Sequence, residues 1–130
     1  MVVDTSAIYA ILAGEPERER FSRVLATAGG AVVSTATLTE CSAVLLSKQV
    51  GMAPLEVLEE FIQTYRLKVV PVDEAQWRLA TEAMKQFGKG RHPARLNICD
   101  SFSYALAKSL NAPLLFKGDD FAHTDIRPAI

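Results

Sequence analysis

The chain opens with Met1-Val2-Val3-Asp4-Thr5-Ser6, and this stretch decides the fold. A pair of β-branched residues precedes an acid and two hydroxyl residues, and the helical pattern Ala7-Ile8-Tyr9-Ala10-Ile11-Leu12 follows. The stretch therefore predicts a buried strand that runs directly into a helix. Open α/β sheets keep their ligand sites at the carboxyl ends of strands, so we expect the Asp4 carboxylate at such an edge.

The remainder of the chain alternates short apolar runs with longer helical patterns. This alternation is typical of βαβ units, so we expect one α/β domain over residues 1–130 with a mainly parallel central sheet. Further strands are expected at Ala31–Val33, Leu67–Val70 and Leu114–Phe116, with a short edge strand near Ile126. Helices are expected after Ser6, from Pro16 to Ala28, from Ala36 to Val50 with Gly51 as its cap, and onward from Pro54, Asp73 and Asn97. We interpret the helical Trp, Phe and Leu side chains as core, among them Leu55, Trp77 and Leu110.

Composition limits the class of protein. Of the 130 residues, 49% are apolar and 22% are charged, which is ordinary for a soluble globular domain. No apolar run approaches the length of a membrane span, and no basic leader precedes the first apolar residues, so we expect a cytoplasmic protein without a membrane partner. Cys41 and Cys99 are the only cysteines. We interpret them as reduced, small hydrophobic residues, because neither belongs to a zinc-binding pattern.

Four acids are expected at one edge of the sheet. Asp4 and Asp119 follow strands, whereas Glu40 and Asp100 lie near the starts of helices that come after strands or loops at that edge. Clustered carboxylates repel one another and raise one another's pKa unless a cation is present. Mg²⁺ or Mn²⁺ prefers oxygen ligands of this kind and needs only one or two direct carboxylates. The pattern therefore favours a metal site.

Each acid also has a purely structural interpretation. Aspartates at the ends of strands often cap the helix that follows. Thr5 and Ser6 are also able to cap this helix, so Asp4 is not required for that role. Together with its three expected acidic partners, this makes a helix cap the less economical interpretation of Asp4. Thr37-Leu38-Thr39-Glu40 matches a capping box, and Asp100 suits the first turn of a helix. Asp119 and Asp120 lie in a glycine-led turn, where aspartate is common. Taken singly, each acid is structural; only their convergence indicates a functional site.

Basic residues gather in the loop from Gly88 to Pro93 and its flanks. Lys89, Arg91 and Arg95 precede the helix that carries Asp100. Local clusters of this kind bind phosphate backbones, although a net charge of −1 gives the whole molecule no attraction for nucleic acid. From the charge run alone, a solvated surface is the preferred interpretation.

Four segments together resemble the PIN-domain family, and more narrowly the VapC-type toxins of bacterial type II toxin–antitoxin pairs. They are Val3-Asp4-Thr5-Ser6-Ala7, Thr39-Glu40, Asn97-Ile98-Cys99-Asp100-Ser101 and Leu115-Phe116-Lys117-Gly118-Asp119-Asp120-Phe121. The resemblance covers essentially the whole chain. It implies a three-layer α/β/α sandwich and a Mg²⁺- or Mn²⁺-dependent endoribonuclease. It also implies a homodimer, inhibition by a VapB-like antitoxin, and structured RNA such as tRNA or rRNA loops as substrate.

The resemblance assigns roles residue by residue. Asp4, Glu40 and Asp100 match the three core acids, and Asp119 matches the fourth, with Asp120 as its alternative. Asp4 and Asp100 would bind the metal directly, while Glu40 and the fourth acid would hold metal waters or a second ion. Ser6 or Thr5 matches the hydroxyl that hydrogen-bonds near the metal. Lys89, Arg91 and Arg95 would bind RNA phosphates.

Two other functions remain open at this point. One is a receiver-like phosphoacceptor domain, which would use an aspartate after a strand and Lys117 after a late strand. Against it, the expected middle strand Ala31–Val33 is followed by Ser34 and not by an aspartate. The other is a catalytically silent RNA- or protein-binding module on the same fold, because a fold alone does not determine function.

Overall fold

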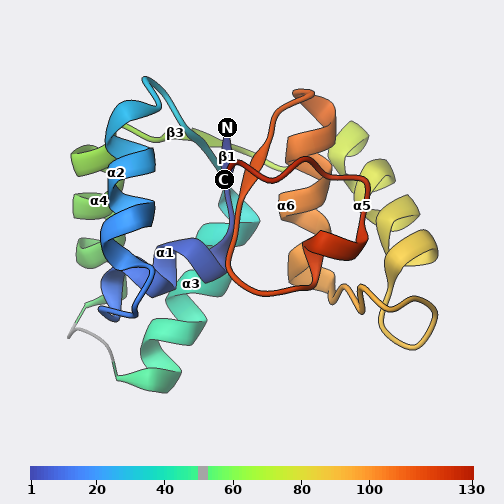
Figure 1. Ribbon diagram of the computed structural model, residues 1–130, viewed down its shortest axis with the longest axis horizontal. Coiled ribbons are helices and arrows are strands. Elements are labelled where there is room, and N and C mark those ends of the chain that lie inside the picture. Colours follow the sequence, from blue (N-terminus) through green and yellow to red (C-terminus); the bar gives the residue numbers. More distant parts are fainter. Residues whose placement is uncertain (50–52) are drawn as a thin grey trace.

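The centre of the molecule is a short parallel sheet. The computed structural model describes residues 1–49 and 53–130 (Figure 1). In these ranges four strands, all parallel, are arranged in the order β3-β2-β1-β4. They are β1 (Val2–Val3), β2 (Val32–Ser34), β3 (Lys68–Val70) and β4 (Leu114–Leu115). The parallel sheet expected from the sequence is confirmed, and its carboxyl edge is where β1 leads into the first helix.

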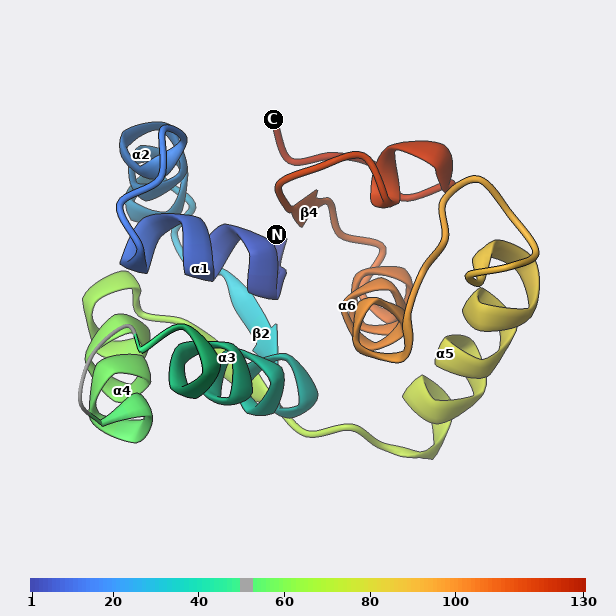
Figure 2. The ribbon, with the colours of Figure 1, turned by 90° about the horizontal axis from the view of Figure 1, so that it is seen from below.

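Helices cover both faces of the sheet, as Figure 2 shows. Val3, Val33 and Leu115 point to one face, and Val2 and Leu114 point to the other. The first face packs against α1 (Thr5–Leu12), α2 (Arg18–Thr27), α3 (Thr35–Lys48) and α4 (Pro54–Tyr65), and the second against α5 (Glu74–Phe87) and α6 (Ile98–Ser109). The three-layer sandwich is therefore confirmed. Within the described ranges, no helix has the length and apolar character needed to cross a membrane.

Side-chain caps determine where the helices begin. Asp73 and Asn97 cap α5 and α6 as expected, and each accepts a hydrogen bond from a backbone N–H three residues later. The capping box expected at Thr37–Glu40 is wrong. Helix α3 begins earlier, because Ser34 at the end of β2 accepts the Ala36 N–H and starts the helix at once. Glu40 consequently lies in the second turn of α3. The expected helix end at Val50 and cap at Gly51 lie outside the described residues.

Three apolar side chains expected in the core are exposed instead. Leu55, Trp77 and Leu110 are 72%, 56% and 49% exposed. Trp77 follows the buried Gln76 by one residue, which turns it about 100° away from the packed face of α5. Leu110 lies beyond the last residue of α6, and Leu55 lies in the first turn of α4.

The edge strand expected near Ile126 is reduced to one parallel bridge between Leu114 and Pro128. The Leu114 N–H donates to the Arg127 carbonyl, and the Ala129 N–H donates back to the Leu114 carbonyl. Between β4 and this segment, η1 (Phe121–His123) is a single 3₁₀ turn whose Phe121 is buried. The C-terminal segment therefore closes the β4 side of the sheet without adding a strand.

Candidate active site

Asp4 is the most deeply buried of the candidate acids, with 4% of its surface exposed. Its Oδ2 atom accepts hydrogen bonds from the Ser6 backbone N–H at 2.9 Å and from Ser6 Oγ at 2.6 Å. Its Oδ1 atom accepts one from Ser103 Oγ at 2.6 Å. Asp4 is thus the N-cap of α1. The sequence-based view that Asp4 does not act mainly as a helix cap was wrong. The same bonds hold the carboxylate at the carboxyl end of β1.

A chain of hydroxyl groups supports this carboxylate from α3 and α6. Ser103 lies 3.2 Å from Thr37 Oγ1, and Thr5 Oγ1 donates to the Thr37 carbonyl at 3.4 Å. From the other side, the Lys117 backbone N–H donates to Ser6 Oγ at 2.9 Å. Sequence reasoning anticipated a hydroxyl at residue 5 or 6 but missed Ser103 and Thr37. The available signal was the spacing of Ser103, three residues after Asp100 and hence on the same side of α6.

Asp100 has a structural role and an unusually high pKa. Its Oδ2 atom accepts the Asn97 N–H at 2.9 Å, and its own N–H donates to Asn97 Oδ1, which completes a capping box. The pKa of Asp100 is raised to about 7, chiefly by burial and also by the negative charges of Asp4, Asp120 and Glu40, while the bond to Asn97 acts to lower it. The structure therefore brings Asp4, Glu40 and Asp120 within electrostatic reach of Asp100.

The two cysteines lie beside these acids. Burial raises the pKa of Cys41 to about 12, with the charges of Asp4 and Glu40 as smaller causes. Burial also raises the pKa of Cys99 to about 12, followed by a hydrogen bond to Glu40 and the charges of the neighbouring acids. Both thiols are free and stay protonated at neutral pH, so they are unsuited to nucleophilic attack.

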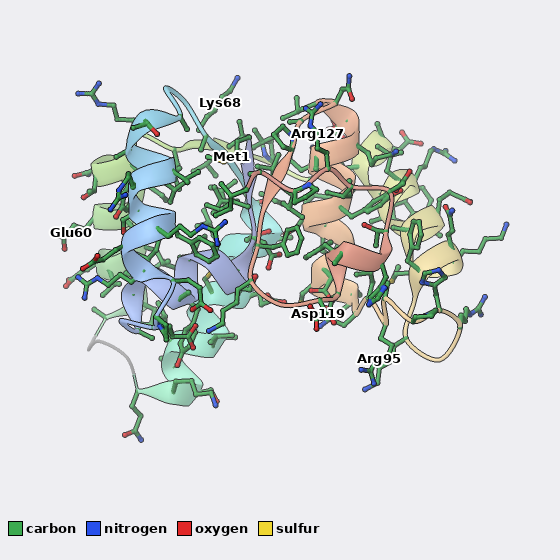
Figure 3. All side chains as sticks on the ribbon, viewed as in Figure 1. Met1, Glu60, Lys68, Arg95, Asp119 and Arg127 are labelled. Carbon is green, nitrogen blue, oxygen red and sulfur yellow. The ribbon has the colours of Figure 1, made fainter. Side chains whose placement is uncertain are left out.

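The turn after β4 holds Asp119 and Asp120, and both are exposed. Figure 3 shows Asp119 at the lower edge of the molecule in that view. Of these two aspartates, Asp120 contributes a charge that raises the pKa of Asp100, and Asp119 is not among the causes of that shift. The assignment of Asp119 as the fourth acid stays a prediction, and the electrostatics favour its neighbour.

Basic side chains are distributed unevenly around this edge. Lys117 Nζ binds Glu15 at 2.8 Å and Glu17 at 2.9 Å, so its ammonium group is directed to the α1–α2 loop. Lys89, Arg91 and Arg95 are exposed, and Figure 3 shows Arg95 near the same lower edge as Asp119. Throughout residues 1–49 and 53–130, neither Asp100 nor the three acids whose charges act on it form an ion pair with a Lys, Arg or His side chain.

The donor set fits a hard divalent cation. It consists of carboxylate oxygens, and the charges of Asp4, Asp120 and Glu40 add to burial in raising the pKa of Asp100, a situation that a bound cation relieves. In the part of the chain that the structure describes, no three His, Cys, Asp or Glu side chains converge closely enough to hold an ion by themselves. Mg²⁺ in proteins usually keeps several waters and takes one or two direct carboxylates.

Known proteins with similar sequences and folds were then compared with the chain. The PIN domain family model matches residues 1–127. Ribonuclease VapC42 of Mycobacterium tuberculosis is 40% identical over 130 residues, covering 99% of this chain and 98% of the relative. Ribonuclease VapC28 of the same species is 44% identical over 131 residues, covering 100% and 98%.

Two solved structures share the fold. Mycobacterium tuberculosis VapC20, a toxin that cleaves the sarcin–ricin loop, superposes with a TM-score of 0.74 at 22% identity over 98% of both chains. A toxin–antitoxin complex from Klebsiella pneumoniae gives 0.66 at 12% identity, over 95% of this chain and 92% of that one. At these identities the two structures support the fold alone. The family model and the full-length relatives carry the assignment: the chain belongs to the PIN-domain family, among the VapC ribonucleases.

Proposed function

We propose that this chain is the toxin of a VapBC-type pair and acts as a metal-dependent endoribonuclease at the carboxyl edge of its sheet. The observation that carries the proposal is the electrostatic state of Asp100. Burial and then the charges of three other carboxylates raise its pKa, and within the described residues none of these acids forms an ion pair with a basic side chain. A bound divalent cation would relieve this repulsion and would support phosphodiester hydrolysis.

Asp4 and Asp100 are the proposed direct ligands of Mg²⁺ or Mn²⁺. When bound, the ion would supply positive charge that activates water and neutralises the phosphate during cleavage. Ser6 and Ser103 fix the Asp4 carboxylate by donating to both of its oxygens, which keeps the ligand in one orientation. A carboxylate held in this way loses little conformational freedom on binding.

Glu40 and the fourth acid are assigned to the water that attacks. Both carry carboxylates near Asp100 and so are able to orient water or accept its proton. Between Asp119 and Asp120, we assign the role to Asp120, because its charge reaches Asp100. Water attack leaves a 5′-phosphate and a 3′-hydroxyl, and Lys89, Arg91 and Arg95 would bind phosphates of the RNA.

The direct test is cleavage of tRNA and rRNA by the purified chain, with Mg²⁺ or Mn²⁺ and again with excess chelator. We expect cleavage that depends on the metal, with 5′-phosphate ends, and no cleavage by the Asp100→Asn variant. Cleavage by Asp100→Asn at the wild-type rate would refute the assignment. RNA binding without cleavage under any metal condition would support the silent binding module instead.

The structure disfavours a receiver-like phosphoacceptor. That function needs the late lysine beside the acceptor aspartate, whereas Lys117 is bound by Glu15 and Glu17. Treatment of the purified protein with a small phosphoryl donor should therefore leave no hydroxylamine-sensitive phosphate on any aspartate.

We also propose that a VapB-like antitoxin covers the acid edge and that the toxin is a homodimer. The support is family membership and the toxin–antitoxin complex among proteins of the same fold. Light scattering of the purified chain tests the dimer, and titration with an antitoxin peptide during RNA cleavage tests the inhibition. Unchanged cleavage at saturating peptide would contradict the proposed binding site.

A further inference from the structure

A second concave surface lies next to the acid edge, between the end of α5, the basic loop and the start of α6. It is an open pocket of about 600 Å³, a size typical of small-molecule sites. Met84, Leu96 and Ile98 form its apolar part, with Leu96 buried at 2% exposure and Ile98 exposed at 61%. We call this the loop pocket.

Cations surround the apolar part of the loop pocket. Lys85, Lys89 and Arg91 all line it, and all three are exposed. Among the described residues, none of the three takes part in an ion pair. An apolar hollow bordered by cations matches a nucleotide, which has an apolar base face and a charged phosphate.

The loop pocket is joined to the acid edge through one residue. Asn97 lines the pocket, and its backbone N–H donates to Asp100 Oδ2 at 2.9 Å. A nucleotide in the pocket would therefore be adjacent to a phosphate placed at Asp100. Gly88 makes this arrangement possible, because a Cβ atom there would collide with the Met84 carbonyl oxygen as the chain turns away from α5.

An exposed aromatic ring extends the same surface along α5. Trp77 lies one helical turn before Thr81, which lines the pocket, and Thr81 Oγ1 donates to the Trp77 carbonyl. The Arg78 guanidinium lies 5.2 Å from the centre of the Trp77 ring. Residues four apart share a face of a helix, so the ring, Thr81 and the pocket form one continuous surface.

We propose that the loop pocket holds one unstacked nucleotide of a single-stranded RNA segment whose scissile phosphate lies at Asp100. The base packs on Met84, Leu96 and Ile98, the flanking phosphates bind Lys89 and Arg91, and the strand continues over Trp77. This inference rests on the proposed ribonuclease function and extends it to the substrate. A base inside a duplex cannot enter the pocket.

Binding is tested with a 2′-O-methyl oligoribonucleotide, which resists hydrolysis, and with Trp77 as reporter, since it is the only tryptophan in the chain. We expect the oligonucleotide to quench Trp77 fluorescence and inorganic polyphosphate to leave it unchanged. The Lys89→Ala/Arg91→Ala variant should bind at least tenfold more weakly. Its plot of log affinity against log salt should be shallower by about 1.4, since single strands lose about 0.7 for each phosphate contact.

The matched control is Lys68→Ala/Arg127→Ala, which removes two exposed cations at the opposite edge of the molecule in Figure 3. It should bind within twofold of the wild type. Equal affinity of the two double variants, or quenching by polyphosphate, would overturn the proposal. The proposal would also be overturned if an acidic, apolar peptide quenched Trp77 fluorescence and the oligonucleotide did not. That result would indicate a docking site for a protein.

Kinetics separate this inference from the proposed function itself. If the wild type cleaves RNA, Lys89→Ala/Arg91→Ala should raise KM at least tenfold while kcat changes less than threefold. If the wild type cleaves RNA and the variant has an unchanged KM, the loop pocket proposal is refuted while the ribonuclease proposal stands. If the wild type does not cleave RNA but binds it in a way that depends on the loop pocket, the ribonuclease proposal is refuted while the loop pocket proposal stands.

Discussion

Replacement of Asp100 by Asn should stabilise the metal-free protein at neutral and higher pH. The carboxyl of Asp100 has a pKa of about 7 in the folded protein against 3.8 for its ordinary value, chiefly because of burial and then of neighbouring acids. Asparagine removes the negative charge and keeps an oxygen that accepts the Asn97 N–H, so the capping box survives. The variant thus separates charge from geometry.

The size of the effect follows from the difference in pKa. Each tenfold change in an acid constant is worth about 1.4 kcal/mol, so the full difference would be roughly 4 kcal/mol. Asp100 is partly exposed, and solvent screening reduces this to about 2 kcal/mol. Because the folded state holds the proton more tightly, the wild type loses this stability as pH rises from about 4 to about 7. The asparagine variant does not.

Thermal unfolding in chelator at pH 4 and pH 8 measures this difference. The two proteins should have similar Tm values at pH 4, and Asp100→Asn should unfold roughly 7 °C higher at pH 8. Saturating Mg²⁺ should then raise the Tm of the wild type more than that of the variant, because only the wild type has both proposed ligands. A wild type more stable than the variant at pH 8 in chelator would refute the electrostatic reasoning.

Other substitutions test single parts of the site. Ser103→Ala removes a donor from the buried Asp4 carboxylate and should lower the free energy of unfolding by about 1–3 kcal/mol, measured by urea denaturation. Asp120→Asn should weaken Mn²⁺ binding in calorimetry more than Asp119→Asn does; the reverse order would restore the original assignment of the fourth acid. Gly88→Ala should lower Tm by several degrees, since its Cβ meets a backbone carbonyl of α5; an unchanged Tm would contradict that geometry.

The elements were predictable where the determining pattern is local. The strand, acid and helix at the start of the chain adjoin one another in sequence, and Asn97 with Asp100 forms its capping box within four residues. The cap of α3 was misassigned because two overlapping patterns were available, and Ser34 forms the earlier one. The exposure of Trp77 was missed because helical periodicity gives spacing without showing which face packs.

The support of Asp4 could not be read from the sequence. Ser103 donates to it across 99 positions of chain, and Thr37 meets Ser103 across 66. These partners are ordinary small polar residues in their own helices and become meaningful only when α3 and α6 are brought together. Similarly, the choice between Asp119 and Asp120 depends on the path of the turn. Two adjacent aspartates cannot be told apart by their local sequence.

The position of β1 has a consequence for how the site is assembled. It lies near the start of the sequence, yet one of its neighbours in the sheet, β4, is formed by residues 114 and 115. Ser103 donates to the Asp4 carboxylate, and the Lys117 N–H donates to Ser6, which itself binds Asp4, so this hydrogen-bond network is complete only when the last quarter of the chain is present. A chain shortened before Ser103 would therefore lack part of the hydrogen bonding that fixes the Asp4 carboxylate in the folded protein.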